Sequence, residues 1–286
     1  MSEANEIYGQ TYGRNIMQLA QQSKSKLINA VYLKPNVDGK TYYQDRIGEW
    51  SMALKAGRHS ATPVSDPNLS RRMGSMLDYN DAVLLDVEDD IKIISDPKSA
   101  YTIAAAKAIG RRYDANIITA ALGTSKAGEA GGTDVTLPTT QIIAEGSANL
   151  TFAKVREAKK KFDDADVEAE DRFFVTSPAG LESLLSIEQA TSSDYNSVKA
   201  LVRGEIDTWM GFKWITSTQL TVANDIRSCF AFQKYGLCLG KSKEAVIRTS
   251  EESTLCYAWQ IYYSVHIGAT RLEEERVVQV NIDETK

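Results

Sequence analysis

Histidine, proline and cysteine are scarce in this chain of 286 residues, which contains two, six and three of them. Neither histidine, His59 or His266, belongs to a spaced metal-ligand motif, so the sequence gives no basis for a zinc site. The three cysteines, Cys229, Cys238 and Cys256, are odd in number, widely spaced and outside any CxxC pair. This pattern indicates free cysteines that pack as small apolar side chains in a protein from a reducing compartment. It argues against a disulfide framework.

Long apolar runs and an excess of positive charge are also missing. No window approaches the roughly 18 apolar residues of a membrane span, and the N-terminus lacks the basic and apolar regions of a secretory signal. We therefore expect a soluble protein that is made inside the cell and has no membrane partner. The net charge of −5, from 33 basic and 38 acidic residues, includes no basic stripe that would neutralise the phosphates of a nucleic acid.

Motifs for catalysis are incomplete, and we expect no enzyme activity, catalytic residue, cofactor or metal. Residues 236–242, GLCLGKS, resemble a phosphate-binding loop, but three residues separate the first glycine from GKS where that loop requires four. Ser177 precedes a proline outside any GxSxG pattern, which favours a helix cap over a nucleophile. One face of a predicted strand would carry Asp86, Glu88 and Asp90. These carboxylates could form a cation site or a solvated acidic surface, and we favour the solvated surface.

The most distinctive segment, residues 96–123, predicts one long helix. Asp96 is suited to cap its first N–H groups and Pro97 to begin it, while Gly123 can end it in the left-handed conformation. Alanine and straight-chain residues dominate between them, with Gly110 as the weak point. An apolar stripe follows the helical repeat: Tyr101, Ala105, Ala108, Ile109, Tyr113 and Ile117. At 1.5 Å per residue the helix would be about 40 Å long, which predicts an elongated molecule.

Two segments before this helix predict projecting arms. Residues 1–40 begin polar and then carry a helical stripe that includes Ile16 and Leu19, so we expect one amphipathic helix that ends before Pro35. Such a helix cannot bury its stripe alone and must lie on another surface.

The second arm spans residues 40–81, which are polar and interrupted by glycine and proline. Alternation at Trp50, Met52 and Leu54, and again from Met76 onward, predicts two strands and a flexible tip. Because an unstructured loop of this length is uncommon inside a compact domain, we expect a long hairpin that packs on a neighbour.

After residue 123 the pattern alternates between helices and strands. We expect helices at 150–162 and from residue 178, with strands at 83–87, 171–176, 229–239 and 245–247. Another strand follows a turn near residues 210–212 and has Phe212 and Trp214 on one face. Apolar residues recur at every second position from 255 to 267 and again at 278–282, which predicts half-buried antiparallel strands. The long helix would lie on the longer of these strands.

Taken in chain order, these segments resemble the major capsid proteins of tailed bacteriophages, whose fold was first described for phage Hong Kong 97. GKTYYQDRIGEW (39–50) is similar to the start of the extended loop in that family. LLDVEDDIKIISDPKSAYTIAAAKAIGRRYDANIITAALG (84–123) resembles the strand, acidic turn and spine helix. DRFFVTSPAGLESLL (171–185) is similar to the start of the axial domain, and GEIDTWMGFKWITS (204–217) to the Gly-Phe hairpin.

The resemblance implies an α+β, Hong Kong 97-type fold in four parts. These are an N-terminal arm (1–40), an extended loop (41–82), a peripheral domain with the spine helix (83–125 and 255–286) and an axial domain (126–254). The lysine and asparagine arrangement that crosslinks the founding member is not identifiable here, so we expect a non-covalent shell.

The resemblance also implies a function and a set of partners. Copies of the chain would assemble in the host cytoplasm as pentamers and hexamers of an icosahedral virion shell. Its partners would be scaffolding protein, a portal, possible decoration or cement proteins, and double-stranded DNA held without sequence-specific contacts. The candidates for contact between subunits are the large apolar side chains of the two arms: Ile16, Leu19, Tyr42, Trp50, Met52 and Leu54.

Two alternatives remain open from the sequence. An encapsulin-like cellular compartment shares the fold but encloses enzymes instead of DNA. A nucleotide-dependent enzyme that uses Lys241 is the alternative from a different class.

Overall fold

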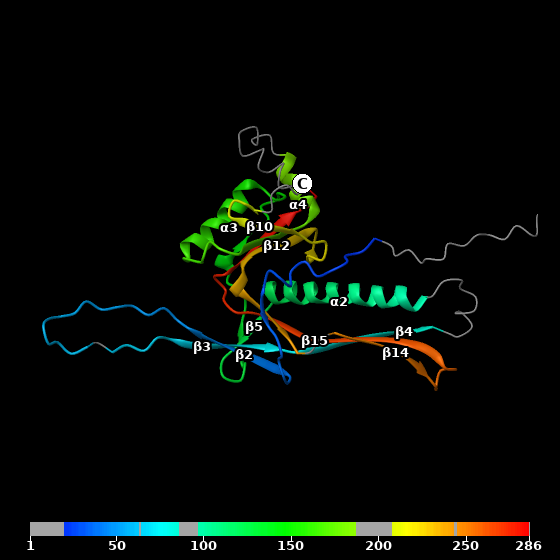
Figure 1. The fold of residues 1–286 in the computed structure, drawn as a ribbon. Coiled ribbons are helices and arrows are strands. Elements are labelled where there is room, and N and C mark those ends of the chain that lie inside the picture. The colour runs from blue at the N-terminus through cyan, green and yellow to red at the C-terminus, as the bar shows by residue number, and fades with distance from the viewer. Residues whose placement is uncertain (1–19, 63, 86–96, 187–207, 243–244, 286) are drawn as a thin grey trace, which may run out of the picture. The chain divides into compact units, whose positions relative to one another are not determined.

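The computed structural model describes residues 20–62, 64–85, 97–186, 208–242 and 245–285 (Figure 1). These residues divide into two compact units. Unit 1 draws on residues 1–25, 78–112 and 243–266, and unit 2 on residues 26–77, 113–242 and 267–286. Helix α2 (Pro97–Leu122) and strand β15 (Ala258–Arg271) each pass from one unit into the other along the chain.

Unit 1 is an antiparallel sheet with the first part of α2 on one face. Strand β14 (Val246–Glu252) pairs antiparallel with the first half of β15, and β4 (Leu77–Leu85) also pairs with β15. The guanidinium of Arg112 lies over the ring of Tyr79, 3.8 Å from its centroid, and this contact joins helix and sheet. The first part of α2 therefore lies on the sheet that contains the long strand β15, as predicted.

Unit 2 contains the larger sheet, whose strands follow the order β7-β16-β12-β8-β10-β9, with β11 paired to β12. Their bounds are β7 (Ile142–Ile143), β16 (Val277–Asp283), β12 (Ile226–Gln233), β8 (Arg172–Thr176), β10 (Phe212–Thr216), β9 (Thr208–Trp209) and β11 (Val222–Ala223). Helices α3 (Phe152–Asp164) and α4 (Pro178–Ser186) belong to the same unit, as do short 3-10 turns η2 (Thr139–Gln141) and η4 (Lys234–Gly236).

Aromatic side chains fill the core beside this sheet. Phe174 is fully buried between Phe212, at an edge-on 5.8 Å, and Trp214, stacked at 4.5 Å between ring centroids. Met210 and Gly211 both have positive φ and form the tight turn that joins β9 to β10. The predicted strand with Phe212 and Trp214 on one face is thus confirmed.

Unit 2 also carries a four-stranded sheet in the order β2-β3-β5-β6. Its strands are β2 (Thr41–Ile47), β3 (Leu69–Ser75), β5 (Ser125–Ala127) and β6 (Thr133–Val135). Strand β1 (Tyr32–Lys34) lies parallel to β13 (Leu237–Lys241), which in turn pairs antiparallel with the last residues of β15. Strands β2 and β3 form a hairpin within the segment predicted as an arm, with Ile47 opposite Leu69, but neither strand is one of the alternating stretches that predicted it.

The long helix is confirmed, but its predicted C-terminal cap is wrong. Gly123 does not adopt a positive φ; its N–H donates to the carbonyl of Thr119 (2.8 Å), as in the preceding turns. Arg271 satisfies the last carbonyls, so a left-handed glycine is not required. Asp96 lies outside the described residues.

Other sequence-based expectations also need correction. Residues 20–31 form bends and turns, where a helix was expected, because the N–H groups of Lys26 and Leu27 donate to the Asp114 carboxylate at 3.0 and 3.1 Å. The described chain between Ile47 and Leu69 contains no strand, so the alternation at Trp50 does not mark one.

One predicted domain boundary also differs. Residues 255–286 were assigned to a single peripheral domain, but β16 pairs along its length with β12. Its Val278, Val280 and Ile282 are fully buried there. The final strand therefore belongs to the large sheet of unit 2, because its apolar face completes that core.

Candidate assembly surface

The tip of the β2–β3 hairpin exposes an unusual concentration of large apolar side chains. Met52 is 100% exposed, Leu54 96% and Trp50 70%. The cross-strand pair Ile47 and Leu69 at its base is exposed as well. Monomeric soluble proteins rarely expose contiguous apolar patches of this kind, which commonly mark interaction sites. We call residues 48–68 the hairpin tip.

The hairpin tip has a closed base. The N–H of Gly48 donates to the carbonyl of Asn68 (2.7 Å), and the indole N–H of Trp50 donates to the hydroxyl of Ser65 (2.8 Å). The two ends of the tip are therefore held together where β2 and β3 end. Removal of the residues between them would leave the strand pairing in place.

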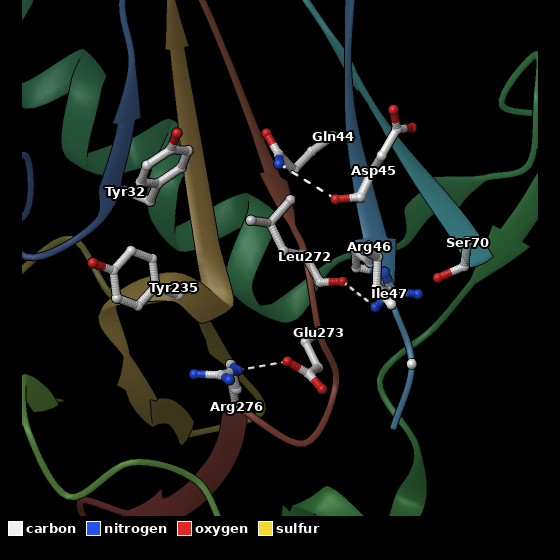
Figure 2. Close-up of a pocket in the computed structure, with 11 residues that line it drawn as sticks. Tyr32, Gln44, Asp45, Arg46, Ile47, Ser70, Tyr235, Leu272, Glu273 and Arg276 are labelled. Atoms are coloured by element: carbon white, nitrogen blue, oxygen red, sulfur yellow. Dashed lines mark hydrogen bonds and ion pairs between the residues drawn. The ribbon is translucent and has the colours of Figure 1, made fainter. Parts of the chain in front are cut away.

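A hollow of about 540 Å³ lies next to the hairpin base (Figure 2). Tyr32 and Tyr235 line one side of it, with ring centroids 5.9 Å apart. Arg46, from β2, lines the other side and donates to the carbonyl of Leu272. The hollow combines an aromatic wall with charged groups, a composition suited to a protein partner.

Tyr42 has a role inside the subunit, which corrects its selection as a contact candidate. Its side chain is 4% exposed, and its hydroxyl donates to the carbonyls of Cys238 (3.1 Å) and Gly268 (3.3 Å). A Cβ at Gly74 or Gly240 would collide with its ring. Burial raises the pKa of Tyr42 well above its ordinary value, so the phenol stays protonated and remains a donor.

Charged residues on the hairpin strands form part of its attachment. Arg71 and Asp45 pair across β3 and β2, and the hydrogen bond from Arg71 lowers the pKa of the Asp45 carboxyl. Arg72, on the opposite face of β3, is buried and binds Glu274 through both carboxylate oxygens at 2.6 and 2.7 Å. This pair was not predicted from the sequence. An arginine at a core-facing position of a strand and the acidic run 273–275 are the signals that indicate it.

The other N-terminal candidates, Ile16 and Leu19, lie outside the described residues. The chain that follows them is attached to α2. In unit 1, Arg111 donates to the side-chain oxygen of Gln21 (2.7 Å), and a Cβ at Gly110 would lie 3.0 Å from the backbone nitrogen of Ser25. Gln21 and Ser25 are thereby held beside α2.

The remaining candidate motifs have structural roles where the structure describes them. The first part of the GLCLGKS segment is the buried strand β13, whose backbone is engaged in pairing with β1 and β15. The hydroxyl of Ser177 accepts from the N–H of Gly180 (3.1 Å), as predicted for a helix cap. His266 pairs with Asp78 on β4. Asp86, Glu88 and Asp90 lie outside the described residues.

The described part of the chain contains neither a metal-ligand cluster nor a membrane-spanning helix. No group of three or more His, Cys, Asp or Glu side chains there is arranged to hold a metal ion. No helix among the same residues is long and apolar enough to cross a membrane.

Several solved capsid structures share this fold. The capsid structure of the cyanophage P-SCSP1u has a TM-score of 0.74 at 16% identity, covering 97% of this chain and 94% of that chain. The capsid of Ralstonia phage GP4 has a TM-score of 0.75 at 8% identity, with 97% and 95% covered. The capsid of cyanophage Pam1 has a TM-score of 0.73 at 11% identity, with 99% and 98% covered. At these identities the similarity is one of fold.

Sequence comparisons identify the family. A search of curated proteins found no match. A family model described as phage capsid protein matches residues 4–284, almost the whole chain. The chain therefore belongs to the phage capsid protein family, and it has the α+β, Hong Kong 97-type fold of tailed-phage capsids.

Proposed function

We propose that this protein is the major capsid protein of a tailed double-stranded DNA phage and that its hairpin tip joins neighbouring subunits in an icosahedral shell. The family match and the fold support the role of shell subunit. The observation that carries the role of the tip is the exposure of Trp50, Met52 and Leu54. Its role is structural, and we propose no catalytic function. The encapsulin-like and nucleotide-binding alternatives are not favoured, because the family that matches is one of phage capsids.

Burial of the hairpin tip on another copy provides the driving force for assembly. Complete burial of one large apolar side chain contributes about 1.5–3 kcal/mol. Part of that gain is offset by the entropy lost on association and on ordering of the tip. A single contact is therefore weak, whereas a closed shell repeats it in every subunit and gains stability from the repetition.

The same proposal includes the partners expected of a phage shell. We infer assembly in the host cytoplasm, guided by scaffolding protein and entered through a portal, with decoration or cement proteins as further candidates. The net charge of −5 is consistent with a shell that encloses packaged DNA without binding it tightly. Ile16 and Leu19 remain proposed contacts of the N-terminal arm.

A shortened hairpin tests the role of the tip. Residues 49–67 are replaced by a two-residue turn, which keeps the contact between Gly48 and Asn68 and both strands. A deletion of residues 44–78 would be less informative, because it would also remove the buried Arg72 and Met76. We expect subunits with an unchanged unfolding transition that form no closed particles, as measured by sedimentation and negative-stain electron microscopy.

A matched pair of variants refines this test. The double variant Met52→Ser, Leu54→Ser removes two exposed apolar side chains from the tip, whereas the control Val222→Ser removes one from β11. We expect closed particles from the control only. A normal yield of shells from the shortened chain would contradict the role of the tip, and enzyme cargo in place of DNA inside native particles would contradict the phage assignment.

A further inference from the structure

A buried charged cluster in unit 2 connects the hairpin to the end of the long helix. Its members are Arg72 on β3, Arg271 at the end of β15 and Glu274 in the turn between β15 and β16. The side chains are 4%, 0% and 16% exposed, respectively. Buried charges are costly unless they are paired, so the positions of these three groups depend strongly on one another.

The hairpin side of the cluster is held by two arginines. Arg72 binds both carboxylate oxygens of Glu274 with one terminal nitrogen, and its Nε donates to the carbonyl of Leu272 (3.1 Å). Arg46, on the paired strand β2, donates to the same carbonyl (Figure 2). Both strands of the hairpin are thus attached to the turn that follows β15.

The helix side of the cluster is held by Arg271. Its Nη1 donates to the carbonyls of Ala121 (3.0 Å) and Gly123 (2.7 Å), and its Nη2 donates to the carbonyl of Val135 on β6 (3.0 Å). A cation at this position also complements the negative end of the dipole of α2. Nε of Arg271 lies 3.6 Å from Glu274.

Glu274 is therefore placed between two guanidinium groups that have different attachments. Nη1 of Arg72 and Nε of Arg271 are buried and have no hydrogen-bond partner among the described residues. Burial lowers the pKa of both arginines, and the charge of Glu274 opposes that effect.

We propose that Glu274 is a positioning residue that fixes the direction of the hairpin relative to the C-terminal end of α2, and so aims the hairpin tip at the neighbouring subunit. The effect on assembly rests on the proposed function of the tip. About ten residues of extended chain reach up to roughly 30 Å, so a rotation of about 10° at the base would displace the far end by about 5 Å. Such a displacement exceeds what a packed contact tolerates.

The test compares Glu274→Gln with the control Glu275→Gln. Glutamine keeps the size of the side chain and removes its charge, and Glu275 is an exposed member of the same acidic run. In unassembled full-length subunits, we expect amide hydrogen exchange in β2 and β3 to become about tenfold faster in the Glu274 variant. Exchange in β12 and β16 should be unchanged in both variants. The yield of closed particles should fall in the Glu274 variant alone.

Two outcomes would overturn the proposal. Unchanged exchange in β2 and β3 would show that the hairpin is positioned by other contacts. Equal acceleration in β12 and β16 would show a general loss of stability. If Glu274→Gln does not fold, Arg72→Lys serves as the second variant. Lysine keeps the positive charge but lacks the forked geometry that binds the carbonyl of Leu272 and the carboxylate of Glu274 together. The same two outcomes would overturn the proposal with this variant.

The shortened hairpin separates this proposal from the proposed function. In a chain that lacks residues 49–67, Glu274→Gln should still accelerate exchange in β2 and β3, although no particles are expected. If the shortened chain assembles normally, the role of the tip fails, and the exchange experiment still decides whether Glu274 holds the hairpin base.

Discussion

Gly110 shows how one missing side chain allows two segments to meet. It is the weak point of α2 by helix propensity, yet a Cβ there would lie 3.0 Å from the nitrogen of Ser25 and 3.3 Å from the carbonyl carbon of Lys24. These are backbone atoms, which cannot rotate away as a flexible side chain does. The sequence identifies the weak point, whereas the close approach that explains it comes from the tertiary structure.

A variant at this position tests that account. We expect Gly110→Val to destabilise the subunit by about 1–3 kcal/mol, because the added methyl groups overpack the crossing with Lys24 and Ser25. The control Ala106→Val places the same β-branched residue at an exposed position of the same helix. Urea unfolding of both variants provides the measurement. Equal effects of the two substitutions would mean that helix propensity alone is responsible.

Tyr42 illustrates what the sequence could not determine at the scale of a residue. Strand alternation shows that Tyr42 and Gln44 share a face, but it does not show which face is covered by the same chain. Gly74 and Gly240 leave room for the ring, and both belong to other strands. Only the tertiary structure brings these strands to Tyr42.

At the scale of an element, helix α2 ends because of a residue about 150 positions away in the sequence. The guanidinium of Arg271 binds the carbonyls of Ala121 and Gly123. Local rules predicted a glycine cap because Gly123 stands at the expected position. The choice between the two caps depends on a strand that the local sequence does not contain.

Removal of this cap should be costly. We expect Arg271→Met to destabilise the subunit by about 3–5 kcal/mol, because it leaves three carbonyls without their donor and removes one of the two guanidinium groups beside Glu274. The control Arg248→Met replaces an exposed arginine of β14, where a change within about 0.5 kcal/mol is expected. Chemical denaturation of unassembled subunits measures both. A loss below about 1 kcal/mol for Arg271→Met would show that water or other donors satisfy the helix end.

At the scale of the whole molecule, stability should depend on acidic pH through exposed ion pairs. The hydrogen bond from Arg276 lowers the pKa of the Glu168 carboxyl, and that from Lys213 lowers the pKa of the Asp171 carboxyl. Each folded-state pKa thus lies below its unfolded value. The stability that each pair contributes is present above the unfolded pKa, near 4, and is lost as the pH falls through the folded pKa.

We therefore expect the unfolding temperature to be nearly constant between about pH 7 and pH 5 and to fall below about pH 4. Glu168→Gln should make that fall shallower, because one titrating pair is removed, whereas the exposed Glu170→Gln should not. Thermal unfolding followed by circular dichroism across this range measures the slope. The prediction for Glu168 is wrong if the wild type and this variant have parallel profiles.

The sequence by itself determined most of the elements and the position of the hairpin. Helix α2, the β9–β10 turn and the alternation of β15 are local patterns, because they reflect the periodicity of one segment or the conformational freedom of one glycine. For the same reason, the sequence identified the apolar residues 50–54, whose exposure the structure then showed. The hairpin strands β2 and β3 lie outside the alternating segments that predicted them, so the sequence placed the hairpin within residues 40–81 but not its strands.

The tertiary structure alone decided which sheet β16 joins, how α2 ends and where Tyr42 lies. It also revealed the cluster around Glu274. Each of these depends on contacts between segments that are far apart in the chain, such as Arg72 with Glu274. Hydrophobic periodicity predicts which face of a helix or strand is buried. It does not predict which other segment covers that face, because burial is favourable against any apolar partner.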